Sequence, residues 1–228
     1  MKINKGKLAV FSLILNGVFV LFFAGKRYYY SHSVPTSTTY EDNWNAARES
    51  ILSVLPIDSN DIIFLGNSLT EGFPVEEMFH STHIKNRGIR GNQSKHIIGR
   101  INEIVDGHPR KLFLDIGIND ILQNVPLDTL FANYKVIINI IRDKSPSTQL
   151  YVQSVFPVGV KEKKYEATVE AFNKQLKAYC LEKGIMFIDL FPSFYRDEGL
   201  DPSLTYDDIH LNGKGYEIWK KAIDSLVN

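Results

Sequence analysis

The 228-residue sequence has a single cysteine and no excess charge of either sign, since 26 basic residues balance 26 acidic ones. One cysteine cannot form a disulfide within the chain, so the fold depends on its hydrophobic core. The lack of a basic excess argues against nucleic acid as a partner, because such sites need clustered positive charge. The apolar fraction of 44% excludes a disordered chain. What remains is a globular protein built around one domain with appendages.

One long apolar run breaks this even composition near the N-terminus. Residues 8–24 are almost wholly apolar, and three lysines precede them. This length suits a short membrane-spanning helix or the core of a signal peptide, and the basic flank predicts a cytoplasmic N-terminus. Phe22 stands where signal-peptide cleavage needs a small residue, which slightly favours a retained anchor. Either way, we expect the rest of the chain to be exported to a periplasmic or extracytoplasmic location.

The composition divides the chain into three parts. We predict an anchor or signal segment over residues 1–30, a small polar linker over 31–40 and one domain over 41–228. Without residues 1–25 the chain keeps 23 basic and 26 acidic residues, a net charge of −3, so the argument against nucleic acid still holds. Contact with a membrane is expected through the N-terminal segment alone, and the oligomeric state is left open.

Short apolar runs rich in β-formers alternate with helical patterns along the domain. The predicted strands cover residues 61–65, 111–116, 149–155 and 185–190, with a weaker one at 83–86. Apolar residues at helical spacing lie in residues 130–141, 169–180 and 216–227, and Gly184 is a candidate helix stop. This alternation indicates βαβ units and a parallel sheet covered on both faces. We therefore predict an α/β fold, a flavodoxin-like three-layer α/β/α sandwich with a five-stranded parallel sheet.

Turn segments rich in glycine, serine and asparagine follow three of the predicted strands. They read Gly-Asn-Ser-Leu-Thr-Glu-Gly at 66–72, Asn-Arg-Gly-Ile-Arg-Gly-Asn at 86–92 and Gly-Ile-Asn-Asp at 117–120. A fourth segment, Asp-Asp-Ile-His at 207–210, precedes the last helix. Ligands of such sheets bind beyond the carboxyl ends of the strands. We expect the four segments to meet in one site.

The residue types in these segments fit acyl transfer. Ser68, at a tight strand-to-helix turn, is a candidate nucleophile, and His210 is the candidate base that takes its proton. Asp207 stands three residues before His210, a spacing that lets one turn hold its carboxylate against the imidazole. The Ser68 N–H, the Gly91 N–H and the Asn119 side-chain amide are candidate oxyanion-hole donors.

These segments resemble the four sequence blocks of the SGNH (GDSL-type) hydrolase superfamily, as GNSLTEG, NRGIRG, GIND and DxxH. The resemblance is greatest to the platelet-activating-factor-acetylhydrolase-like branch with its bacterial esterases. It implies a serine esterase that removes short acyl groups, often acetyl, from sugars or lipids without a cofactor. Asn67 replaces the aspartate of the eponymous motif, and the effect of that change is left open. No serine lies in the G-x-S-x-G context of ordinary α/β-hydrolases.

Several neighbouring residues have a simpler interpretation. Asp208 competes with Asp207 but lacks its spacing, and Gly88 competes with Gly91 but suits a structural turn. Asp120 is expected to be a turn or helix cap. Arg87 and Arg90 are expected to be solvated, with an anionic substrate as the alternative.

Other residues are assigned to the core, the surface or the substrate pocket. Cys180 lies on an apolar helix face and is expected to be inert. Residues 122–127 and 156–160 are expected to line the acyl or alcohol pocket. Five histidines show no metal-ligand spacing, so no metal is expected: His32, His80, His83, His96 and His108.

Two other functions compete with ester hydrolysis. Residues 68–70 after the first strand of a flavodoxin-like sheet suit a phosphate or flavin loop, but that reading leaves Asn119 and His210 unused. The chain also fits an inactive, anchored glycan-binding relative, although such proteins usually lose a catalytic residue. For the substrate, carbohydrate O-acetyl esters are favoured because an exported enzyme meets glycans, and lipid esters remain an alternative.

Overall fold

The computed structural model describes residues 37–227, with side chains from residue 43 onward. From residue 48 onward, the described residues form one compact unit. Helix α2 (Ser37–Val54) begins inside the range predicted as a linker, where a run of Ser and Thr favours a helix start. The predicted segment 1–30 lies outside the described residues, and among residues 37–227 no helix has the length and apolarity to cross a membrane.

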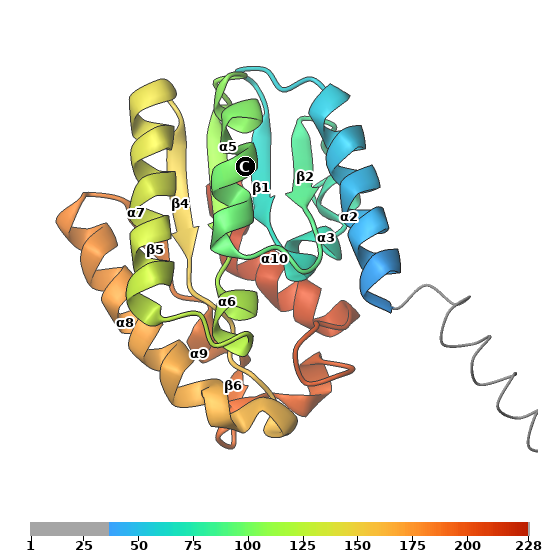
Figure 1. The fold of residues 1–228 in the computed structure, drawn as a ribbon, viewed down its shortest axis with the longest axis vertical. Helices are drawn as coiled ribbons and strands as arrows, with labels where there is room; N and C mark the ends of the chain where they lie inside the picture. Colours follow the sequence, from blue (N-terminus) through green and yellow to red (C-terminus); the bar gives the residue numbers. More distant parts are fainter. Residues whose placement is uncertain (1–36, 228) are drawn as a thin grey trace, which may run out of the picture. The chain divides into compact units, whose positions relative to one another are not determined.

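Five parallel strands form the central sheet, in the order β2-β1-β3-β4-β5 (Figure 1). Their bounds are β1 Ile62–Gly66, β2 Ile84–Gly88, β3 Lys111–Asp115, β4 Gln149–Gln153 and β5 Met186–Ile188. Residue Gly66 at the end of β1 pairs with Gly88 on one side and Asp115 on the other. The three strands that carry the glycine-rich turns are therefore neighbours, and their carboxyl ends share one edge. The predicted flavodoxin-like fold is confirmed.

Two strands end earlier than the apolar runs predicted, because side chains take their backbone groups. Asn173 bonds both the N–H and the carbonyl of Val155 at 2.8 Å, so the backbone after β4 pairs with a helix. The Ser154 hydroxyl accepts the amides of Leu190 and Phe191 at 3.0 Å, which ends β5 at Ile188. Residues 154–158 thereby leave the sheet, and the Gly159 N–H that follows donates to the carbonyl of Asp208 at 2.7 Å.

Helices cover both faces of the sheet (Figure 1). Helices α5 (Ser94–Val105), α7 (Leu127–Lys144) and α8 (Glu166–Glu182) pack together on one face. On the other face, α10 (Gly213–Val227) places Trp219 against Phe73 and Phe156, and Phe73 in turn packs on Phe64 of β1. Helix α8 is followed by Gly184 with a φ of 63°, the left-handed conformation that stops a helix, as predicted.

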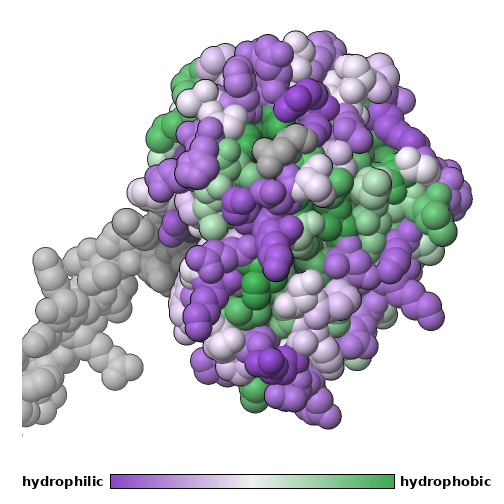
Figure 2. Space-filling model, turned by 180° about the vertical axis from the view of Figure 1, so that it is seen from behind, coloured by the Kyte–Doolittle hydropathy of each residue, from purple (hydrophilic) through white to green (hydrophobic). Residues whose placement is uncertain are grey.

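Short elements connect the strands and the longer helices. They are α3 (Ser68–Glu71), α4 (Val75–Met78), α6 (Ile118–Leu122), α9 (Phe191–Phe194), the hairpin of β6 (Tyr195–Arg196) and β7 (Gly199–Leu200), and the 3₁₀ turns Val160–Tyr165 and Pro202–Leu204. Figure 2 shows hydrophilic and apolar residues interspersed on the face that Figure 1 hides. The functional candidates lie at the carboxyl edge, where short turns bring several strands together.

Candidate active site

Ser68, His210 and Asp207 form one chain of hydrogen bonds. Ser68 is the first residue of α3, immediately beyond β1, and His210 lies just before α10. The Ser68 Oγ is 2.8 Å from His210 Nε2, and His210 Nδ1 is 2.7 Å from Asp207 Oδ2. The structure thus brings together all three residues of the predicted triad, in the order that nucleophile, base and orienting carboxylate require.

A tight turn holds the aspartate against the histidine. Asp207 Oδ1 accepts the backbone N–H groups of Ile209 at 3.1 Å and His210 at 2.7 Å. Burial favours the protonated acid, but these bonds and the imidazole together lower the pKa of Asp207. Asp208 has a φ of 76° and pairs with Lys161 at 3.0 Å instead. The carboxylate that faces His210 is therefore that of Asp207, as the spacing predicted.

The three predicted oxyanion donors come from three adjacent strand ends. Among the described residues no group accepts the N–H of Ser68 or Gly91. Gly91 has a φ of 70°, a conformation that glycine adopts without strain. The Asn119 side-chain amide donates one N–H to Asn92 O at 2.9 Å, which fixes its plane and leaves the second N–H for a ligand.

Arg100 is the residue at this site that the sequence analysis missed. Its Nε donates to Asn92 Oδ1 at 3.0 Å, its Nη1 to Arg87 O at 2.9 Å and its Nη2 to Gly66 O at 3.0 Å. The side chain is 4% exposed, and burial lowers the pKa of Arg100 to about 10. A signal was available, because Arg100 falls on the apolar stripe of α5 with Ile97 and Ile101.

A buried network ties α6 to the start of α5. Asp120 accepts the Ser94 N–H at 2.9 Å and the Ser94 hydroxyl at 2.6 Å, and Asn133 donates to that hydroxyl at 2.8 Å. A carboxylate at a helix N-terminus satisfies free amides and complements the helix dipole. Asp120 is thus a helix cap, as expected, but for a helix that follows a different strand.

Asn67 occupies the position of the family aspartate and caps α3. Its Oδ1 accepts the Leu69 N–H at 2.9 Å, while its Nδ2 is buried without a partner in the described structure. The helix that follows has four residues, and this bond already uses one of its amides. The turn therefore offers little to a phosphate, which weakens the phosphate-loop alternative.

The second block, NRGIRG, contains two arginines and a glycine with different surroundings. Arg87 is 3% exposed, with its guanidinium 3.4 Å from Leu55 O, so the prediction of a solvated side chain is wrong. Arg90 is exposed and pairs with Glu71 at 2.6 Å. Gly88 allows close packing, since a Cβ there would lie 2.2 Å from the Glu71 amide nitrogen. Its structural role agrees with expectation.

The predicted pocket residues divide into core and surface. Phe156 and Val158 are buried, and Phe156 packs on Phe194 and Trp219, so these two do not line an open pocket. Val160 is 74% exposed.

Cys180 is buried and burial raises its pKa to about 11, which agrees with an inert core thiol.

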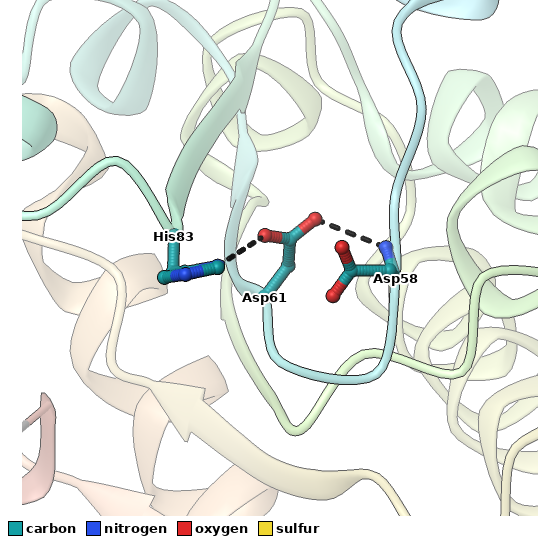
Figure 3. Close-up of side chains that lie close together, drawn as sticks. All are labelled: Asp58, Asp61 and His83. Carbon is teal, nitrogen blue, oxygen red and sulfur yellow. Dashed lines mark hydrogen bonds and ion pairs between the residues drawn. The ribbon is translucent and has the colours of Figure 1, made fainter.

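A second group of titratable side chains lies at the amino end of β1 and β2 (Figure 3). Ligand atoms of Asp58, Asp61 and His83 lie within 4.8 Å of one another, a grouping that sequence spacing did not predict. Asp61 accepts the Asp58 N–H at 3.0 Å, Asp58 accepts the Asn60 N–H at 2.8 Å, and His83 Nδ1 is 3.5 Å from Asp61 Oδ1. These bonds shape the turn that enters β1, at the opposite end of the strand from Ser68.

Comparison with known proteins agrees with this geometry. Residues 64–218 match the GDSL-like lipase/acylhydrolase family. The chain is 22% identical over 196 residues to human platelet-activating factor acetylhydrolase IB subunit alpha2, covering 82% of this chain and 84% of that protein.

Two solved structures share the fold. A GDSL-like lipase from Bacteroides thetaiotaomicron has a TM-score of 0.71 at 21% identity, covering 80% of this chain and 96% of its own. A catalytic mutant of an acetylxylan esterase from Geobacillus stearothermophilus has a TM-score of 0.61 at 18% identity, covering 76% and 97%. The chain therefore belongs to the GDSL-like lipase/acylhydrolase (SGNH) family of carboxylic ester hydrolases.

Proposed function

We propose that this protein is a serine esterase that removes short acyl groups, chiefly acetyl, from carbohydrate esters. The observation that carries the proposal is the continuous hydrogen-bond chain from Ser68 through His210 to Asp207. A serine hydroxyl is a weak nucleophile until a base takes its proton, and this chain places the base 2.8 Å from it.

The geometry leads to a two-step reaction. Ser68 Oγ attacks the ester carbonyl while His210 Nε2 takes its proton, and Asp207 stabilises the imidazolium. The negative oxygen of the tetrahedral intermediate is held by the N–H groups of Ser68 and Gly91 and by Asn119. The intermediate collapses, the ester C–O bond breaks, and His210 protonates the departing alcohol. Water then attacks the acyl-enzyme with His210 as base, releasing the acid and returning the proton to Ser68.

The choice of acetyl rests on what the relatives have in common. The human relative is named an acetylhydrolase and the Geobacillus structure an acetylxylan esterase. These names differ in the alcohol but share the acyl group. The core position of Phe156 and Val158 also supports a short acyl chain, because these apolar side chains are already packed.

The choice of a carbohydrate alcohol rests on Tyr206. Its ring lies nearly parallel to that of His210, at 15° and 5.8 Å between centroids, and the residue is 71% exposed. An aromatic ring with a polar tip beside the catalytic base offers a sugar both an apolar face and a hydrogen-bond partner. Lipid esters stay the alternative, because the predicted anchor would hold the site near a bilayer.

The first experiment measures p-nitrophenyl acetate hydrolysis by the full-length protein and by Ser68→Ala. We expect Ser68→Ala to lower kcat by about 10⁴-fold or more, with loss of fluorophosphonate labelling. Equal hydrolysis by both proteins would overturn the mechanism. Acetylated sugars tested against p-nitrophenyl esters of increasing chain length then decide the substrate. A preference for acyl chains of eight or more carbons would contradict the carbohydrate proposal.

We also propose that residues 1–30 direct the catalytic domain to the outside of the cytoplasmic membrane. The support is the apolar run 8–24 with its preceding lysines. An exported esterase of this kind would meet acetylated glycans directly.

A further inference from the structure

The hydrogen bonds of Arg100 reach all three segments that carry the candidate oxyanion donors. Gly66, whose carbonyl accepts Nη2, stands two residues before Ser68 at the end of β1. Asn92, whose side chain accepts Nε, directly follows Gly91. The Asn92 carbonyl in turn accepts the Asn119 amide from the end of β3. One guanidinium thus links three strand ends, two directly and the third through Asn92.

The charge of Arg100 is not neutralised by a hydrogen-bonded carboxylate. In the described part of the chain its acceptors are two carbonyl oxygens and one amide oxygen. Glu49 and Glu103 stabilise the cation through space, but no carboxylate among the described residues is hydrogen-bonded to it. Burying an arginine without such a bond carries a desolvation cost, which a neutral hydrogen-bonding side chain would avoid. A fixed positive charge in a dry region acts strongly on negative charge that develops nearby.

We infer that Arg100 is a positioning residue for the oxyanion hole, which sets the three donors relative to one another and places a buried positive charge behind them. This inference rests on the proposed esterase function. Arg100 would contribute in two ways: its hydrogen bonds hold the three donors in position, and its positive charge stabilises the negative oxygen. Each contribution is removed by a different substitution.

The first test compares Arg100→Met with Arg87→Met in the full-length protein. Arg87 is a matched control, because its side chain is also buried and its guanidinium donates to Asn86 O and Leu55 O. Only its backbone carbonyl accepts from Arg100, and Met keeps that carbonyl. The measurements are kcat and KM for p-nitrophenyl acetate and the inhibition constant of an alkyl boronic acid, whose serine adduct is a tetrahedral anion. All are made well below the melting temperature of each variant.

We expect Arg100→Met to lower kcat by about 100-fold and boronate affinity by a similar factor, with KM changed by less than about threefold. Arg87→Met should keep kcat within about threefold of wild type. The inference is overturned if kcat falls by the same factor in both variants. It is also overturned if Arg100→Met binds the boronic acid as tightly as wild type does.

Asn92→Asp tests the charge of Arg100 alone. It is also the second test of the inference if Arg100→Met fails to fold. Aspartate keeps the acceptor for Arg100 and the backbone carbonyl for Asn119, but it neutralises the cation. We expect an unchanged or higher melting temperature together with about a tenfold lower kcat. Full activity in Asn92→Asp would overturn the role of the charge.

The activity of the wild-type protein shows whether a negative result concerns the proposed function or only the role of Arg100. Wild type without Ser68-dependent hydrolysis overturns the proposed function and this inference with it. Active wild type with fully active Arg100 and Asn92 variants overturns the inference alone.

Discussion

At the scale of single residues, the site depends on which atom of each side chain faces its neighbour. Asp207 uses one oxygen for two backbone amides and the other for the imidazole, so its position is fixed from two sides. That arrangement holds the proton on His210 Nδ1 and leaves Nε2 as the acceptor for Ser68. The tautomer of the histidine is therefore set by the turn from Asp207 to His210.

Asp207→Asn tests this assignment. The new amide would still accept the two backbone N–H groups, but its NH₂ would donate to His210 Nδ1 and favour a proton on Nε2. We expect kcat for p-nitrophenyl acetate to fall by about 10³- to 10⁴-fold with little change in KM.

Asp208→Asn is the control for that prediction, since the same change is made one residue away. Asparagine tolerates the positive φ of 76° at this position, and the lost ion pair with Lys161 is at the surface. Its kcat should remain within about threefold of wild type. A larger loss in Asp208→Asn than in Asp207→Asn would reassign the orienting carboxylate.

At the scale of elements, the ends of the strands carry the catalytic candidates and also a buried carboxyl group that costs stability. Asp115 closes β3 beside Gly66, and its Oδ2 is buried without a partner in the described structure. Burial raises the pKa of Asp115 to about 7, well above its ordinary value of 3.8. The folded protein therefore binds this proton more tightly than the unfolded chain does.

The sign of the resulting pH dependence follows from that difference. As pH rises from about 4 to about 7, the unfolded chain releases the proton first, so Asp115 costs the wild type about 1.4 kcal/mol of stability per pH unit. Asp115→Asn lacks this loss. Urea unfolding of both proteins between pH 4 and 9 should show a gap that widens to about pH 7 and then stays constant. A gap independent of pH would contradict the prediction.

The strands, and the meeting of the segments that follow them, could be predicted from the sequence for physical reasons. Strands covered on both faces read as apolar runs, and the residues beyond them must meet at one edge. The early ends of β4 and β5 could not be predicted, because they depend on Asn173 and Ser154, side chains from other segments. Arg87 and Arg100 were missed for a related reason, since a charged side chain is buried only where distant carbonyls happen to converge on it.

At the scale of the whole molecule, the N-terminal segment is basic and the rest of the chain is slightly acidic. Three lysines and no acids lie in residues 1–25, and the remaining chain has a net charge of −3. We expect the full-length protein in bacterial cells to stay with the membrane after alkaline carbonate washing. Protease added outside the cytoplasmic membrane should digest the catalytic domain. Recovery in the cytoplasmic fraction would contradict the predicted export.

The hydrogen bond between Ser68 and His210 joins residues 142 positions apart. During synthesis, the nucleophile leaves the ribosome long before its base, and closing so long a loop comes late in folding. A nascent chain would therefore carry an unactivated serine. Hydrolysis would begin when the last strand and the segment before α10 are in place, so ester turnover reports that the chain has finished folding.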